Sequence, residues 1–113
     1  SLDSVAELFR AALSRLREGD AAGAAVACRE ALDVAPRNPD LLALLGACLV
    51  ALREPTEALV HLDSALELAP SHARAWDERG RALLQLRRID EAVLSLQRAM
   101  ALDRINAAAE PSQ

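Results

Sequence analysis

The chain has 113 residues, enough for one domain or one short repeat array, because ordinary domains run to roughly 100–200 residues. Its formal net charge is −4, all 13 basic residues are Arg, and charges of both signs are interspersed, which describes solvated helix faces rather than a nucleic-acid-binding surface. No stretch approaches the roughly 20 apolar residues of a membrane span, and the N-terminus lacks a signal-peptide pattern. We therefore expect a soluble, cytoplasmic protein.

Composition predicts an all-α fold. Hydrophobic types make up 52% of the chain, mostly as Ala and Leu, and only Phe9 and Trp76 are aromatic. Ala and Leu favour helices, whereas sheets favour the β-branched and aromatic types that are scarce here. Cys28 and Cys48 lie in apolar helical runs without metal-ligand spacing, so we expect small buried thiols.

Helix-start signals divide the chain into six predicted helices. Ser4 and Glu7 can form a capping box, and Asn38 before Pro39 gives an N-cap followed by the residue best tolerated in the first helical turn. Pro55 can open a helix but cannot sit inside one. The expected helices run near 4–18, 21–35, 39–52, 55–69, 73–86 and 89–102.

Residues of similar size recur at a step of 34 along the chain. The recurring sets are Ala24, Ala58 and Ala92; Ala31, Ala65 and Ala99; Val26, Val60 and Leu94; Cys28, Leu62 and Leu96; Pro36 and Pro70; and Gly46 and Gly80. Such a period indicates a helical repeat in which stacked helix pairs bury a continuous core. Because the two glycines are expected where paired helices touch, Gly80→Leu should damage the fold far more than Ser95→Ala.

This pattern resembles the tetratricopeptide repeat over residues 4–106. Repeat three supplies Trp76, Gly80, Leu83, Ala92, Leu96 and Ala99, and repeat two supplies Leu42, Leu45, Gly46, Leu49, Ala58, Leu62, Ala65 and Pro70. The resemblance implies a right-handed superhelical array of antiparallel helix pairs. The whole chain, 1–113, then forms a single domain with repeats over 3–36, 39–72 and 73–106 and a short tail over 107–113.

Repeat one departs from the pattern. Its second helix keeps the step of 34, but its apolar residues Phe9, Leu13 and Leu16 lie 36 positions before Leu45, Leu49 and Leu52. An insertion of two residues near 19–23 would reconcile the two steps. On that register, which we favour, Arg10 occupies the place of the small packing residue; on the step of 34 it is Ala12.

The residues offer no arrangement typical of catalysis. Neither His61 nor His72 has a second metal ligand four residues away with a third nearby. Ser14, Ser64 and Ser95 have no recognisable His and Asp partners, and the four glycines form no phosphate-binding loop. We therefore expect a protein that is not an enzyme and needs no cofactor or metal, with Trp76 serving as a packing residue.

By the resemblance, the first helix of each repeat lines a concave groove that takes a peptide or helix of a partner protein. The groove positions are Asp40, Ala43, Leu44, Ala47 and Val50 in repeat two, and Arg74, Asp77, Glu78, Arg81 and Leu84 in repeat three. Repeat one adds Glu7, Leu8 and Ala11 on the favoured register, or Phe9, Arg10 and Leu13 on the other. Arg88 extends the charged ridge of the third repeat.

The expected function is that of a protein–protein interaction scaffold or adaptor. One subtype of the family clamps the C-terminal carboxylate of heat-shock chaperones with Lys and Asn. The corresponding places here hold Ala47, Asp77 and Arg81, of which only Arg81 has a suitable character, so the resemblance argues against a chaperone-tail adaptor.

Two alternatives are a self-association module and the regulatory, non-catalytic arm of a larger enzyme. For the first, Val93, Leu96 and Met100 are candidates for an exposed face of the last helix, which a second copy or sequence outside this chain would cover.

Overall fold

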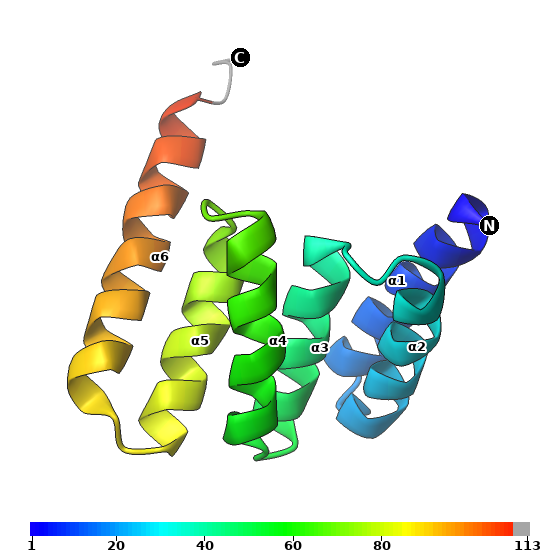
Figure 1. Ribbon diagram of the computed structural model, residues 1–113, viewed down its shortest axis with the longest axis horizontal. Coiled ribbons are helices and arrows are strands. Elements are labelled where there is room, and N and C mark those ends of the chain that lie inside the picture. Colours follow the sequence, from blue (N-terminus) through cyan, green and yellow to red (C-terminus); the bar gives the residue numbers. More distant parts are fainter. Residues whose placement is uncertain (110–113) are drawn as a thin grey trace.

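The computed structural model describes residues 1–109, which form six helices and no strand. The helices are α1 (Leu2–Arg17), α2 (Ala21–Val34), α3 (Pro39–Ala51), α4 (Pro55–Leu68), α5 (Ala73–Gln85) and α6 (Ile89–Ala109). They pair in chain order as three antiparallel hairpins that stand side by side (Figure 1). The predicted all-α array of helix pairs is confirmed.

Polar side chains cap the helix starts, as the sequence signals indicate. Asn38 accepts hydrogen bonds from the backbone N–H groups of Asp40 and Leu41, at 3.0 and 3.2 Å, and Asp20 accepts from Gly23 at 2.9 Å. Such caps satisfy backbone donors that have no partner inside the helix. The first helix differs from the prediction: it begins at Leu2 with Ser1 as its N-cap, so the capping box expected at Ser4 is wrong.

The two-residue insertion predicted in repeat one is also wrong. The turn inside each hairpin has a residue with positive φ, and these three residues, Gly19, Arg53 and Arg87, follow one another at the step of 34. Ala12 is fully buried at the position that corresponds to Gly46, whereas Arg10 is exposed. The step of 34 therefore holds through all three repeats.

The misleading spacing arises from the way α1 packs. Phe9, Leu13 and Leu16 are half-buried and pack against the main apolar cluster, which includes residues of α3. On the step of 34 they correspond to Ala43, Ala47 and Val50, the side of α3 that was assigned to the groove. As the first helix of the array, α1 turns its apolar face toward α3 and leaves the opposite side to solvent.

Close contact inside the second and third hairpins depends on glycine. A Cβ built at Gly80 would lie 2.6 Å from Cδ2 of Leu96 on α6, and one built at Gly46 would collide with Leu62 on α4. Atoms packed at that separation repel strongly, so only a residue without a side chain lets these helices approach so closely. The predicted contact of the two glycines with their paired helices is confirmed.

The last helix is longer than predicted. It continues to Ala109 instead of ending near 102, so the first part of the expected tail 107–113 is helical; residues 110–113 lie outside the described residues. The sequence explains this difference. Pro36 and Pro70 follow the ends of α2 and α4, whereas the next position at the step of 34 is Arg104. Without proline, and with alanines following, nothing stops the helix there.

A polar network joins α4, α5 and α6. Ser95 is almost fully buried and accepts a hydrogen bond of 2.6 Å from Nη1 of Arg79. Arg79 also donates to Asp63 at 2.9 Å and lies over the ring of Trp76 at 5.8 Å from its centroid. The Trp76 indole N–H donates to the carbonyl of Pro70, which supports its predicted packing role. Because Ser95 is buried, the large difference predicted between Gly80→Leu and Ser95→Ala needs correction.

We expect Gly80→Leu to lower the free energy of unfolding by about 1–3 kcal/mol, because overpacking forces α5 and α6 apart. Ala11→Leu is the matched control, since it adds the same side chain at an exposed position of α1. Urea denaturation of both variants and the wild type measures the difference. Equal midpoints for the two variants would contradict the close contact.

Ser95→Ala should cost about 1–3 kcal/mol, because it leaves a guanidinium N–H of Arg79 without its buried acceptor. Ser64→Ala is the control: its hydroxyl donates only to the carbonyl of Val60 one turn earlier. The same denaturation series compares the two serines. If both variants have the same denaturation midpoint as the wild type, the network does not stabilise the fold.

Candidate functional site

The array curves with its first helices inside. The backbone of α3 contacts those of α1 and α5, whereas, among the described residues, the backbones of α2, α4 and α6 do not approach one another. An array that is tight along one side and open along the other bends toward the tight side. We call the surface formed by α1, α3 and α5 the inner face.

Four of the predicted groove residues are not available on the inner face. Ala43, Leu44, Ala47 and Val50 are all buried, as part of an unbroken run of buried residues from Leu41 to Val50. Their assignment to the groove surface needs correction, because α3 lies between α1 and α5 and the side chains of α1 cover its small residues. The other assigned positions are exposed or half-buried: Asp40, Arg74, Asp77, Glu78, Arg81 and Leu84.

Four charged side chains of α5 lie among the assigned groove positions. We name Arg74, Asp77, Glu78, Arg81 and Leu84 the α5 ridge. Within it, Nε of Arg81 donates to Oδ2 of Asp77 at 3.1 Å. Partial burial raises the pKa of Glu78 above its ordinary value, while Arg74 and Arg81 act in the opposite direction. A carboxylate that is incompletely solvated at this surface favours a partner that supplies positive charge or hydrogen-bond donors.

Arg88 does not belong to the ridge. It makes two hydrogen bonds to Glu91 at the start of α6, the shorter of 2.6 Å, and the carboxylate raises the pKa of its guanidinium above the ordinary value. The predicted extension of the ridge through Arg88 is therefore wrong.

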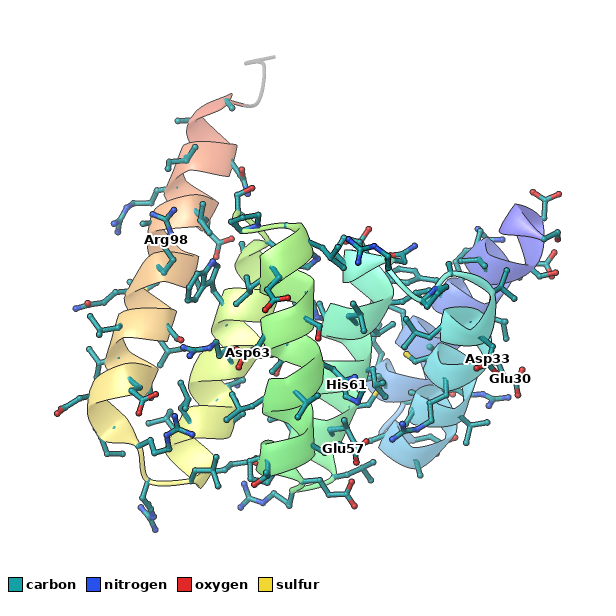
Figure 2. The ribbon with its side chains drawn as sticks, in the orientation of Figure 1. Glu30, Asp33, Glu57, His61, Asp63 and Arg98 are labelled. Carbon is teal, nitrogen blue, oxygen red and sulfur yellow. The ribbon has the colours of Figure 1, made fainter. Side chains whose placement is uncertain are left out.

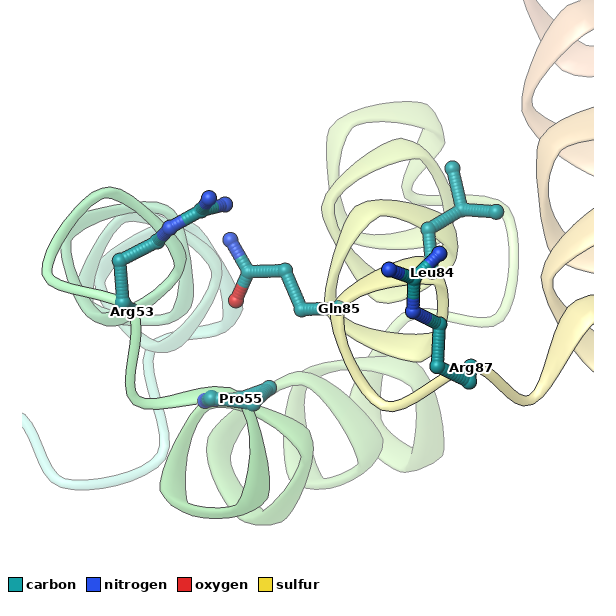
Figure 3. A pocket seen from close by; sticks show the side chains of 5 residues that line it. All are labelled: Arg53, Pro55, Leu84, Gln85 and Arg87. Carbon is teal, nitrogen blue, oxygen red and sulfur yellow. The ribbon is translucent and has the colours of Figure 1, made fainter.

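The C-terminal end of the ridge opens into a cavity of about 480 Å³. Arg53, Pro55, Leu84, Gln85 and Arg87 line it, with Arg53 on the turn between α3 and α4 and Arg87 on the turn that follows α5 (Figure 3). Neither arginine makes an ion pair within residues 1–109. Two guanidinium groups are thus available to an anionic group of a ligand.

Gln85 lines this cavity and joins α5 to α3. Its Nε2 donates to the carbonyl of Val50 at 2.9 Å and so ties α5 to the end of α3. Its Oε1 is buried and has no hydrogen-bond partner among the described residues. The contact between α3 and α5 therefore carries the cost of a buried acceptor without a partner.

Sequence reasoning missed Arg53, Gln85 and Arg87. A usable signal was present for the two arginines, because they follow Gly19 at the step of 34 and therefore occupy equivalent turns of successive repeats. Nothing in the sequence marked Gln85, whose role depends on the distance between α5 and the end of α3.

Both histidines interact with side chains that stabilise the fold. Nδ1 of His72 accepts from the backbone N–H of Ala75 and caps α5, so its Nε2–H donates to Asp40 at 2.8 Å. On the outer surface, Glu57 lies 3.0 Å from Arg29 of α2 and 3.5 Å from His61 on α4 (Figure 2). Hydrogen bonding to Arg29 holds the pKa of Glu57 below its ordinary value. Both clusters tie neighbouring repeats together.

The remaining chemistry of residues 1–109 is sparse. Cys28 and Cys48 are fully buried, as predicted, and the contact with Cys48 together with burial raises the pKa of Cys28. In this part of the chain no group of three His, Cys, Asp or Glu side chains could hold a metal ion. None of the helices described is both long and apolar enough to cross a membrane.

The fold defines an α-solenoid of three helical hairpins whose inner face carries charged side chains. Comparison with protein families matches residues 15–77 and residues 73–106 to the tetratricopeptide repeat. The chain belongs to the tetratricopeptide-repeat family, whose repeats are in general non-catalytic interaction modules. No curated protein is detectably similar in sequence.

Solved structures share this fold at low sequence identity. The first TPR domain of human RPAP3 is 22% identical with a TM-score of 0.83, over 88% of this chain and 79% of that one. The first TPR of Spaghetti (RPAP3) bound to the HSP90 peptide SRMEEVD is 22% identical with a TM-score of 0.83, over 90% and 81%. The TPR2B domain of yeast Sti1 in complex with pHsp70 is 21% identical with a TM-score of 0.84, over 94% and 86%.

We expect Glu78→Gln to increase the free energy of unfolding at pH 7. Burial raises the pKa of Glu78 in the folded state, so the folded protein binds this proton more tightly than the unfolded chain does. The contribution of Glu78 to the free energy of unfolding is therefore fully present below the unfolded pKa of about 4.3. It is lost as the pH rises through the folded pKa.

The gain from Glu78→Gln should accordingly shrink as the pH falls below about 4. Denaturation at a series of pH values measures it, with the exposed Glu67→Gln as the control. A gain of equal size at all pH values would contradict the assigned cause.

Proposed function

We propose that this chain is a protein–protein interaction module that holds an extended or helical segment of a partner against the α5 ridge. The segment runs toward the cavity between Arg53 and Arg87. The observation that carries the proposal is the juxtaposition of the ridge with a cavity lined by Arg53 and Arg87, whose guanidinium groups make no ion pair within residues 1–109.

The chemistry of these groups describes the segment. Guanidinium groups bind carboxylates through paired hydrogen bonds, so an acidic side chain or a terminal carboxylate suits the cavity. Along the ridge, Arg74 and Arg81 alternate with Asp77 and Glu78, which favours a segment with charges of both signs over a uniformly charged one.

Structures of similar fold with bound chaperone peptides support the peptide-binding mode. They do not support the same ligand for this chain. Of the places that hold the chaperone clamp in the family, Ala47 is buried and Asp77 is an acid already paired with Arg81. A partner other than a chaperone tail fits this surface better.

Arg81→Glu tests the ridge directly. Peptides selected from a random display library against the wild-type protein serve as the probe, and titration calorimetry measures their affinity at two salt concentrations. We expect about tenfold weaker binding, equivalent to about 1.4 kcal/mol, together with near-normal melting because Arg81 pairs only with an exposed neighbour. The double variant Arg53→Ala/Arg87→Ala should weaken binding as well.

Arg98→Glu is the matched control, because Arg98 is an exposed arginine on α6, away from the inner face. SRMEEVD is the comparison peptide: its carboxylates suit the cavity, but without the chaperone clamp it should bind more weakly than the selected peptides. Equal affinities of wild type and Arg81→Glu would remove the ridge from the binding site, and tight binding of SRMEEVD would contradict the excluded chaperone role.

Self-association is a second candidate function. Val93 and Met100 of α6 are 45% and 58% exposed, although their counterparts in α4 pack against the core. A large apolar side chain that is buried in one repeat and open in the next marks a surface suited to contact with another protein.

A further inference from the structure

An apolar stripe runs along the open side of α6. Ile89, Val93, Leu96 and Met100 follow one another at steps of four, three and four, which places them on one face of a helix. Ile89, Val93 and Met100 are about half exposed, and Leu96 is half-buried against Gly80. We call these four residues the α6 stripe.

The stripe occupies repeat positions that are better covered in α4. One repeat back, Val93, Leu96 and Met100 correspond to Leu59, Leu62 and Leu66 of α4, which are buried or half-buried. The helices α2 and α4 pack against the first helix of the next repeat. Within the described residues no helix follows α6, so its stacking surface is formed but not covered.

A second copy cannot cover the stripe by continuing the array head to tail. Such stacking would place α1 of one copy on α6 of the next. The positions of α1 that correspond to the buried Leu41, Leu45 and Leu49 of α3 hold Glu7, Ala11 and Arg15, all exposed. Burying the charges of Glu7 and Arg15 against an apolar stripe would be unfavourable.

Charges of opposite sign lie symmetrically along the stripe, so they could pair between two copies of α6. Asp90, Gln97 and Arg104 recur every seven residues and therefore lie along one flank of the stripe. All three are exposed, and Asp90 and Arg104 make no ion pair within residues 1–109. Asp90 and Arg104 are equally distant from Gln97, at about 10 Å each along the helix axis.

We propose that two copies of this chain associate through antiparallel pairing of their α6 helices about a twofold axis at Gln97. In this arrangement the same flank of both helices meets, so Asp90 lies opposite the partner's Arg104, and Gln97 lies opposite the partner's Gln97. Val93 reaches the level of the partner's Met100, and Leu96, which packs against Gly80, lies at the level of the axis. A parallel pair would not bring Asp90 to the partner's Arg104.

The extended end of α6 makes this pairing accessible. Arg104 lies in the part of α6 that continues past Ala73, the N-terminal end of α5. Figure 1 shows this part of the helix projecting from the array. The partner chain can therefore approach Arg104 without meeting the α4–α5 turn. The contact is isologous and closes at two copies, which avoids open-ended assembly.

This inference rests on the self-association proposed above, and the experiment separates the two. Sedimentation equilibrium of the whole chain from about 1 μM to about 1 mM, a range suited to a weak dimer, measures association. The variants are Val93→Glu, Asp90→Arg, Arg104→Asp and the double variant Asp90→Arg/Arg104→Asp. Leu94→Glu is the matched control, because Leu94 is 68% exposed on the same helix but outside the stripe.

We expect a monomer–dimer equilibrium for the wild type that Val93→Glu abolishes and Leu94→Glu leaves intact. Each single charge reversal should weaken the dimer about tenfold, and the double reversal should restore it, because it exchanges the two charges across the axis. A wild type that stays monomeric throughout overturns self-association itself. A dimer that the double reversal fails to restore, or that Leu94→Glu disrupts instead, overturns the antiparallel arrangement alone. Circular dichroism of each variant verifies that the helices are retained.

Discussion

The close approach of two helices inside each hairpin is the constraint on which the remaining structure depends. At Gly80, Leu96 fills the space that a side chain would need, and Leu62 does the same at Gly46; in the first hairpin the position is held by fully buried Ala12. Because the helices sit so near each other, their outer flanks are brought within reach of the next hairpin. The stacking contacts, the curvature of the array and the position of the inner face all follow from that separation.

Stacking then decides where a partner can bind. The central helix α3 contacts four helices, α1, α2, α4 and α5, and its residues from Leu41 to Val50 become core. An array of three hairpins is short, so the helix that would form the middle of the binding surface serves as structural support instead. The surface that we propose for a partner lies on α5, where the core side needs only Ala75, Gly80, Ala82 and Leu83 and the other positions remain free to carry charge.

The sequence predicted well whatever depends on local or strictly periodic signals. The helix count, the proline-marked starts of α3 and α4 and the glycine contacts needed only the step of 34 and the chemistry of proline and glycine. It predicted poorly what depends on the ends of the array. The apolar residues of α1 were assigned to the wrong register, because a terminal helix has a neighbour on one side only and its hydrophobic pattern is rotated accordingly. The end of α6 was misplaced for a related reason, since no proline marks it. Gln85 could not be found at all, because its importance comes from a distance between two helices.

The turns that carry Arg53 and Arg87 have a consequence for how this protein can change. Both residues adopt φ of 62°, a left-handed conformation that costs an ordinary residue roughly 1 kcal/mol or more, whereas the first repeat uses Gly19 for the same turn. Glycine at either position would relax the backbone and remove a guanidinium from the cavity. Selection for heat resistance alone would therefore favour glycine at these two positions. Retention of arginine in warm-adapted versions of this chain would show that the cavity, rather than the fold, is what selection maintains.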